Sequence, residues 1–327
     1  MSINESEHMQ IAILDDYQGV ALDYGDWDSV YRECDVTVFR HTISDHRQLV
    51  EALECFDIVV AMRERTPFPA SILEELPRLK LLVTTGSRNR SIDLTAATAH
   101  DIMVCGTDSP AGGTVELTWG LILALARSIH QHDTALRSGS WQLYLGNELQ
   151  GKTLGVLGLG RIGSAVAAIG RAFGMEVITW SQNLTAGAAR GSGADLVSKD
   201  ELFQLSDVLT IHLVLSDRTR GLVGDSEIAQ MRPTAYLINT SRGPIIEEGA
   251  LMSALQDRRI AGAAIDVFDL EPLPADHPFR GLENMLLSPH MGYVTKEAYE
   301  VFYTQVVEDI TAFLRGSPIR ILAPATT

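Results

Sequence analysis

The chain has 327 residues, of which 46% are hydrophobic and 21% charged, and its formal net charge is −16. This length and composition predict a soluble protein that has a large core and divides into two domains. The negative charge argues against binding to nucleic acid or to an anionic membrane surface, because both need a basic face.

The three cysteines, Cys34, Cys55 and Cys105, are odd in number, widely spaced and without metal-ligand pairing. They indicate a reducing compartment, and no metal site is predicted. Residues 1–10 are polar and acidic and lack the features of a secretory signal, so we expect a cytoplasmic protein. The longest apolar run, residues 117–126, is too short to span a bilayer and is interpreted as a buried helix.

Strand-like apolar runs recur in the first third of the chain, separated by helix-compatible segments. They are Ile11–Leu14, Val36–Phe39, Ile58–Ala61, Leu79–Thr84 and Ile102–Cys105. This alternation predicts a parallel sheet. A polar, glycine-rich joint at residues 106–113 then precedes one long apolar helix over about residues 114–137, and we interpret the joint as a crossover between domains.

The next unit contains a GxGxxG turn, Gly158-Leu159-Gly160-Arg161-Ile162-Gly163. It follows a short apolar strand over residues 153–157 and opens a helix whose apolar face recurs at helical spacing, before a second strand over residues 176–181. The first glycine permits the tight turn, the second lets the backbone approach phosphates, and the third lets helix and strand pack closely. In this context we interpret the turn as a cradle for the pyrophosphate of a dinucleotide rather than a turn that binds nothing.

Further strands are predicted over residues 208–214, 235–240, 261–267 and 285–287. Ser198 to Glu201 has the spacing of a capping box, so a helix is expected to begin there. From Lys296 to about Leu314 the pattern is that of one amphipathic helix, which we infer returns to the first domain.

Polar residues follow three of these later strands. One segment is Thr240-Ser241-Arg242-Gly243, a second contains Asp266 and Glu271, and a third is Ser288-Pro289-His290. Ligands of open parallel sheets bind outside the carboxyl ends of the strands. An arginine, a carboxylate and a histidine are therefore expected to converge on one edge.

Taken in order, the GLGRIG, NTSRG, DVFxxEP and SPH segments resemble those of the D-isomer-specific 2-hydroxyacid dehydrogenase family. The resemblance implies that Arg242 binds the substrate carboxylate and polarises its carbonyl, that His290 is the general acid/base, and that Glu271 pairs with His290. Histidine suits proton transfer near neutral pH, a carboxylate favours and orients the imidazolium, and arginine offers a planar fork to a carboxylate. Taken singly, Arg242 has the alternative of a surface ion pair and Glu271 that of a loop carboxylate.

The same resemblance implies further contacts. Arg161 and Ile162 would lie at the pyrophosphate, Asp266 near the nicotinamide carboxamide, and Thr240 with the His212-Leu213 turn along the cofactor. Asp266 has the alternative of a strand-end cap, and Thr240 and Leu213 that of packing. In the first domain, Gly86, Ser87 and Arg88 would belong to the loop that holds the substrate carboxylate, with Arg63 in a similar loop; both arginines have the alternative of solvated charges.

The chain departs from the family pattern at the end of the second strand of the GxGxxG unit. NAD-preferring members carry an acidic residue there, whereas this chain has Ser181, followed by Gln182 and Asn183. No arginine or lysine follows at once to clamp a 2′-phosphate. We expect NADP(H) slightly ahead of NAD(H), with use of both as the alternative. The loop at residues 87–90 is bulkier and more cationic than is common among relatives, and it would suit a substrate with a second acidic or polar group.

The predicted fold class is α/β, with two doubly wound parallel-sheet domains and the active site in the cleft. Residues 1–108 plus 296–327 form a flavodoxin-like substrate domain, and residues 109–295 form the Rossmann domain that binds the dinucleotide. The predicted function is an NAD(P)-dependent reductase of 2-oxo acids, also running as a D-2-hydroxyacid dehydrogenase. The alternative is a non-enzymatic NAD(H)-sensing protein resembling the corepressors of this fold. The apolar helix from residue 114 predicts a homodimer.

Overall fold

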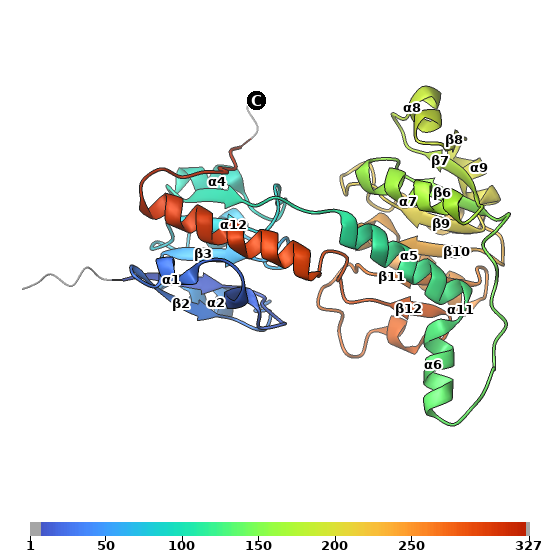
Figure 1. Ribbon diagram of the computed structural model, residues 1–327, viewed down its shortest axis with the longest axis horizontal. Helices are drawn as coiled ribbons and strands as arrows, with labels where there is room; N and C mark the ends of the chain where they lie inside the picture. Colours follow the sequence, from blue (N-terminus) through green and yellow to red (C-terminus); the bar gives the residue numbers. More distant parts are fainter. Residues whose placement is uncertain (1–7, 325–327) are drawn as a thin grey trace, which may run out of the picture. The chain divides into compact units, whose positions relative to one another are not determined.

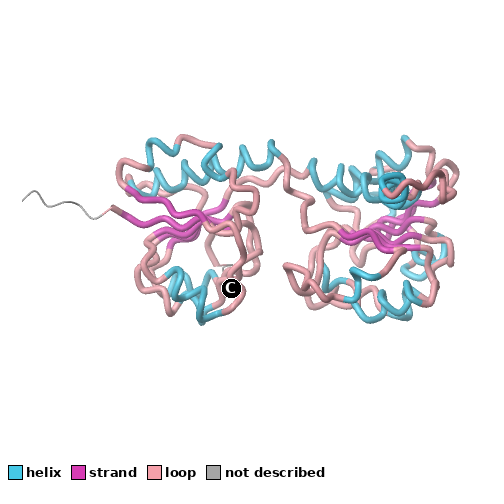
Figure 2. Tube along the Cα trace, turned by 90° about the horizontal axis from the view of Figure 1, so that it is seen from below, coloured by secondary structure: helices cyan, strands magenta, loops and turns pink. Residues whose placement is uncertain are grey.

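The computed structural model describes residues 8–324 of the chain. They form two compact units: the first contains the chain up to Pro110 and from Val294 onward, and the second is Ala111–Tyr293. In each unit helices cover both faces of one central sheet (Figure 2). The predicted fold class, two α/β parallel-sheet domains, is confirmed.

The first unit contains a five-stranded sheet in the order β2-β1-β3-β4-β5, with every neighbouring pair parallel. Its strands are β1 (Met9–Ile13), β2 (Cys34–Val38), β3 (Ile58–Ala61), β4 (Leu81–Thr84) and β5 (Met103–Gly106). The central strands β3 and β4 are buried along their whole length, which explains why they appear in the sequence as uninterrupted apolar runs. The five predicted strands are all present.

The helices of the first unit are mostly short. They are η1 (Ala21–Asp23), α1 (Trp27–Val30), α2 (His46–Leu53), α3 (Ala70–Leu73), α4 (Leu94–Ala99) and α12 (Lys296–Leu314). The last helix, α12, lies along this sheet with Phe302, Val306 and Ile310 buried on one face (Figure 1). It is capped at its start by Thr295, whose hydroxyl accepts from the N–H of Ala298.

The second unit contains a seven-stranded parallel sheet in the order β12-β11-β10-β9-β6-β7-β8. Its strands are β6 (Thr153–Leu157), β7 (Glu176–Trp180), β8 (Asp195–Leu196), β9 (Val208–Ile211), β10 (Tyr236–Asn239), β11 (Gly262–Ile265) and β12 (Met285–Leu287). The order reverses between β6 and β9, as it does between β1 and β3 in the first unit. Such reversal points are where open α/β sheets bind ligands.

The helices of the second unit begin with α5 (Gly112–Ala126) and α6 (Ile129–Arg137). They continue with α7 (Arg161–Ala172), α8 (Ala186–Gly191), α9 (Lys199–Leu205), α10 (Asp225–Ile228), η2 (Gly243–Ile245), α11 (Glu248–Gln256) and η3 (Pro278–Gly281). The predicted capping box is confirmed: the Ser198 hydroxyl and the Glu201 side chain each accept from the other's N–H at the start of α9. No helix among residues 8–324 is long and apolar enough to cross a membrane.

The prediction of one helix over residues 114–137 is wrong, because the chain forms α5 and α6 with a break between them (Figure 1). Ser128, at the break, has a left-handed backbone with φ of 51°. A right-handed α-helix requires a φ near −60°, so no residue can continue one in that conformation. Apolar periodicity runs on across the break, so the sequence pattern did not reveal it.

Candidate active site

The GxGxxG turn lies at the reversal point between β6 and β9, and its three glycines occupy three different environments. Gly158 has a φ of +100°, and a Cβ there would lie 2.7 Å from the carbonyl oxygen of His212. A Cβ on Gly163 would lie 2.1 Å from the carbonyl oxygen of Gly158, so only glycine lets α7 approach β6 this closely. Gly160 is the N-cap of α7, and a Cβ there would meet nothing within 4 Å.

This arrangement fits a dinucleotide. The N–H groups of the first turn of a helix have no partner within the helix. At the start of α7 the space above Gly160 is open. Such a helix start favours a phosphate anion. The residues present therefore suit the pyrophosphate that the turn predicts.

The second unit brings together Arg242, Glu271 and His290, the three predicted catalytic residues. Nδ1 of His290 lies 2.5 Å from Oε2 of Glu271, and the other carboxylate oxygen, Oε1, accepts from the N–H of Phe268 at 2.8 Å. Nε2 of His290 makes no hydrogen bond to the described part of the chain. The pairing therefore orients the imidazole and leaves Nε2 for a ligand.

Glu271 is held as an anion. Burial alone would raise its pKa, but the hydrogen bond and charge of His290, the Phe268 N–H and the charge of Arg242 together lower the pKa below the usual range of glutamate. An ionised carboxylate beside Nδ1 accepts a hydrogen bond from that nitrogen and so fixes the orientation of the His290 ring.

Asp266 holds the loop that carries His290. Its Oδ1 accepts from the hydroxyl of Ser288 at 2.5 Å and the N–H of Met291 at 2.9 Å, and its Oδ2 accepts from the N–H of Gly292 at 3.0 Å. His290 itself has a left-handed backbone with φ of 51°. The buried carboxylate therefore stabilises an unusual loop conformation, a role close to the strand-end cap that the sequence left open. Burial raises the pKa of Asp266.

Arg242 sits in a loop fixed by Asn239, the last residue of β10. The Asn239 amide donates to the carbonyl oxygen of Arg242 at 3.0 Å and accepts from the N–H of Ser241 at 3.0 Å. The Ser241 hydroxyl donates to the carbonyl oxygen of Ile211 at 2.8 Å, which ties the loop to the neighbouring strand β9. Nη1 of Arg242 donates to the carbonyl oxygen of Ser241 at 2.6 Å.

The remaining residues predicted at the cofactor lie around the same edge of the sheet. His212 and Leu213 pack against Gly158, and Nε2 of His212 lies 3.0 Å from the Thr210 hydroxyl. Desolvation lowers the pKa of His212 to about 4, so the ring is neutral. The Thr240 hydroxyl lies 2.9 Å from that of Thr118 on α5, so Thr240 links β10 to α5. Ser181 follows β7 directly, and Gln182 and Asn183 are exposed in the turn after it.

The first unit contains the other predicted site residues. Arg63 follows β3 with a left-handed backbone (φ 54°), and its Nη1 donates to the Ser109 hydroxyl at 2.9 Å. The Arg63 guanidinium lies against Gly86, where a Cβ would come within 2.2 Å of Nη1. The N–H of Gly86 already donates to the Thr107 hydroxyl at 2.8 Å, so it is not available to a substrate. Ser87 and Arg88 are exposed.

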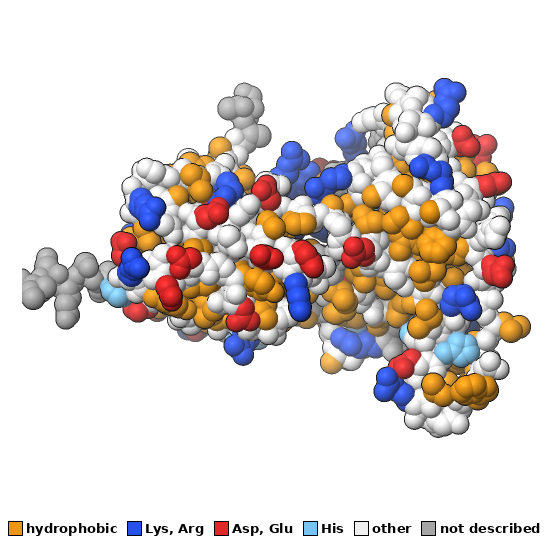
Figure 3. Space-filling view, in the orientation of Figure 1, with side chains coloured by type: hydrophobic (Ala, Val, Ile, Leu, Met, Phe, Trp, Pro, Cys, Tyr) orange, Lys and Arg blue, Asp and Glu red, His pale blue; other side chains and the backbone are white. Residues whose placement is uncertain are grey.

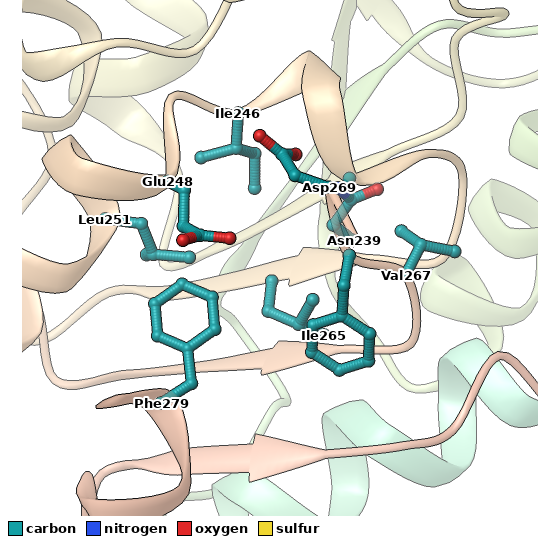
Figure 4. A pocket seen from close by; sticks show the side chains of 10 residues that line it. Asn239, Ile246, Glu248, Leu251, Ile265, Val267, Asp269 and Phe279 are labelled. Atoms are coloured by element: carbon teal, nitrogen blue, oxygen red, sulfur yellow. The ribbon is translucent and has the colours of Figure 1, made fainter. Parts of the chain in front are cut away.

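A hollow lies on the second unit between the start of α11 and the loop after β11. Ile246, Leu251, Ile265 and Phe279 line it, and Glu248 and Asp269 reach it from different sides (Figure 4). Burial, with the charge of Glu248, raises the pKa of Asp269. Arg242, Glu271 and His290 do not line this hollow, but Asn239 and Phe268, which hydrogen-bond Arg242 and Glu271, do.

Sequence reasoning missed the side chains that hold the loops: Asn239, Ser288 and Thr114, whose hydroxyl donates to the carbonyl oxygen of Gly292 at 3.0 Å. Of these, only Asn239 could have been found from the sequence, because an asparagine side chain at the end of a strand can form hydrogen bonds to the backbone of the turn that follows. Among the residues that the structure describes, no group of three or more His, Cys, Asp or Glu side chains is arranged to hold a metal ion.

Comparisons with known proteins bear on the same region. The family model described as "D-isomer specific 2-hydroxyacid dehydrogenase, NAD binding domain" matches residues 119–292. Over 255 residues the chain is 41% identical to the glyoxylate reductase of Aeropyrum pernix, which covers 75% of this chain and 76% of that protein.

Two further similarities extend over most of the chain. It is 38% identical over 273 residues to the D-3-phosphoglycerate dehydrogenase of Methanocaldococcus jannaschii, a match that covers 82% of this chain and only 52% of that longer protein. The solved structure of a phosphoglycerate oxidoreductase from Vibrio cholerae aligns with a TM-score of 0.90 and 38% identity, over 94% of this chain and 99% of the other.

Proposed function

Because the chain belongs to the D-isomer specific 2-hydroxyacid dehydrogenase family, we propose that it reduces a 2-oxo acid to the D-2-hydroxy acid with Arg242, Glu271 and His290 as its catalytic group. The family relationship makes it a nicotinamide-dependent oxidoreductase acting on 2-hydroxy acids. The observation that carries the assignment of residues is the 2.5 Å pair between His290 and Glu271 with Nε2 of His290 left over.

When bound at the turn of Gly158, Gly160 and Gly163, a nicotinamide cofactor would supply the hydride for reduction of the substrate carbonyl. His290 donates the proton from Nε2 to the carbonyl oxygen, and the ionised Glu271 keeps the imidazole oriented for that transfer. Arg242 offers its guanidinium to the substrate carboxylate and polarises the carbonyl. In the reverse direction His290 accepts the hydroxyl proton.

The substrate carboxylate is proposed to bind the loop after β4. Since Gly86 uses its N–H internally, the donors of this loop are the N–H groups of Ser87 and Arg88, neither of which is hydrogen-bonded to the described residues. Arg63, held by Ser109, adds positive charge beside Gly86. Successive backbone N–H groups next to a cation attract carboxylates.

We propose that the protein uses both cofactors with a slight preference for NADP(H) over NAD(H). Ser181, with the exposed Gln182 and Asn183, lies where a carboxylate would favour the ribose hydroxyls of NAD. These side chains offer hydrogen bonds but no positive charge to a 2′-phosphate. The affinities for the two cofactors are therefore expected to differ by less than they would if a carboxylate or an arginine stood at this position.

The test is a steady-state panel of glyoxylate, hydroxypyruvate, pyruvate and bulkier 2-oxo acids with NADPH and NADH. We expect His290→Ala and Arg242→Ala to lower kcat by about a hundredfold or more, and Glu271→Gln to lower it as well, while cofactor binding followed by fluorescence is retained. His100→Ala, on an exposed position of the first unit, is the matched control. Substantial turnover by His290→Ala would refute the assignment of the acid/base.

The same panel separates the proposal from the alternative of a non-enzymatic NAD(H) sensor. A sensor would bind NADH or NADPH tightly and turn over none of the 2-oxo acids. The pairing of Glu271 with His290 favours the enzyme, because a binding protein has no need of a histidine held ready for proton transfer.

A further inference from the structure

The loop after β4 is fixed from both sides by the buried side chain of Asn89. Its Nδ2 donates to the carbonyl oxygen of Arg63 at 2.6 Å and to the Thr84 hydroxyl at 2.8 Å. Its Oδ1 accepts from the N–H of Ser91 at 2.9 Å and from the Ser91 hydroxyl at 2.6 Å. The backbone between Gly86 and Ser91 is therefore held in one conformation, and Arg88 is presented from it outward.

The Arg88 side chain is exposed, and no hydrogen bond or ion pair within residues 8–324 engages its guanidinium. Nothing in the packing of the first unit accounts for an arginine here, because the fixed loop needs no side chain at this position. The loop backbone donors proposed for the substrate carboxylate belong to Ser87 and to Arg88 itself. The free cation thus projects from the same residue that is proposed to touch the substrate.

The surroundings are cationic in a chain whose net charge is −16. The loops after β3 and β4, residues 62–67 and 85–91, contain Arg63, Arg65, Arg88 and Arg90 against the single carboxylate of Glu64. Arg65 lies over the ring of Tyr17, with its Cζ 4.5 Å from the ring centroid. The carboxylates of the loop after β1, Asp15 and Asp16, are buried and hydrogen-bonded within the unit, Asp15 to Thr66 of the loop after β3, so neither is exposed to solvent.

We propose that the Arg88 side chain makes the protein selective for 2-oxo acids with a second anionic group, either a carboxylate or a phosphate. The inference rests on the proposed function. In the proposed function the loop N–H groups bind the carboxylate next to the keto group, so a substrate with one charge leaves the Arg88 guanidinium without a counter-charge. A second anion at the far end of the substrate supplies that counter-charge and gains charge-assisted hydrogen bonds.

The experiment compares substrates that differ only in the second charge. One pair is 2-oxoglutarate and 2-oxopentanoate, and the other is phosphohydroxypyruvate and hydroxypyruvate. The wild type is expected to prefer the dianion of at least one pair by about tenfold or more in kcat/KM, and the pair with the larger preference distinguishes carboxylate from phosphate. Hydrogen bonds to charged groups contribute about 1.5–3 kcal/mol, so Arg88→Gln should lower the ratio of the two kcat/KM values by about ten- to a hundredfold, mainly through KM of the dianion.

Two further variants make the result specific. Arg88→Lys keeps the charge and should retain part of the preference, whereas Arg47→Gln, which removes an exposed charge paired with Glu51 on α2, should leave the ratio unchanged. A wild type that does not prefer the dianion, or an Arg88→Gln variant that lowers both substrates by the same factor, overturns the inference alone. Failure to turn over any 2-oxo acid overturns the proposed function and the inference with it.

Discussion

At the scale of single residues, the loops of the proposed site depend on buried polar side chains that hydrogen-bond the loop backbone. Asn239 binds Ser241 and Arg242 in the loop after β10, and Asn89 binds Thr84 and Ser91 at the two ends of the loop after β4. Asp266 accepts three hydrogen bonds from the loop of His290. These contacts fix the directions in which Arg242, Arg88 and His290 leave the backbone. Precise placement of reacting groups is what such supporting contacts contribute to catalysis.

His212 leads to a prediction about pH and stability. Its pKa is lowered from 6.5 to about 4 by desolvation, so the folded protein keeps the ring neutral at pH values where the unfolded chain protonates it. Stability rises with pH wherever the unfolded state binds more protons, so the contribution of His212 is complete above about pH 6.5 and is lost as the pH falls toward 4. At about pH 5 the loss amounts to about 2 kcal/mol.

Urea unfolding at about pH 7.5 and pH 5 checks this expectation in the wild type and in His212→Gln. The variant should lose less stability on acidification than the wild type, by about the same 2 kcal/mol. Equal pH dependence in both proteins would show that His212 is protonated as readily in the folded state as in the unfolded chain.

At the scale of elements, the turn between β6 and α7 separates two effects that glycine substitutions usually mix. Gly163→Ala would bring a Cβ to 2.1 Å from a backbone oxygen, whereas Gly160→Ala would place one in open space at an ordinary φ of −82°. Overpacking against backbone costs about 1–3 kcal/mol, so Gly163→Ala should lower the free energy of unfolding by that amount.

Gly160→Ala should unfold almost like the wild type but bind NADPH and NADH more weakly, because its methyl group would occupy the space proposed for the pyrophosphate. Urea unfolding and a fluorescence titration with each cofactor measure the two quantities separately. Normal cofactor affinity in Gly160→Ala would mean that the pyrophosphate does not lie over this residue.

The strands and the GxGxxG unit could be predicted from the sequence for a physical reason. A strand that is buried on both faces of a parallel sheet is a short, uninterrupted apolar run. This describes β3 (Ile58–Ala61) and β9 (Val208–Ile211), which are buried along their whole length. The break at Ser128 could not be predicted, because apolar spacing continues through it. The roles of Asn89 and Asn239 could not be predicted either, since each depends on which backbone groups the fold brings within reach of an ordinary amide.

At the scale of the whole molecule, α6 and the segment after it expose several large apolar side chains close together in the sequence. The exposed side chains include Ile129 and Leu136 on α6 and, beyond it, Trp141, Leu143, Tyr144 and Leu145. Trp141 is 72% exposed and Leu145 99% exposed. Figure 3 shows hydrophobic side chains gathered over the part of the second unit where α6 lies. Contiguous apolar patches of this kind mark protein–protein contacts, and we propose that a second copy of the chain covers this one in a homodimer.

Sedimentation at micromolar concentration should therefore find a dimer in the wild type and a monomer in the double variant Trp141→Ser with Leu145→Ser. These two side chains bury little surface within their own chain, so the variant should keep its far-ultraviolet circular dichroism and remain folded. Leu22→Ser, which removes a 42% exposed apolar side chain from the first unit, is the control and should stay dimeric. Because association is a mass-action equilibrium, dilution should also lower the melting temperature of the wild type but not that of the double variant. A wild-type monomer at micromolar concentration, or a double variant that remains dimeric, would exclude this surface as the dimer contact.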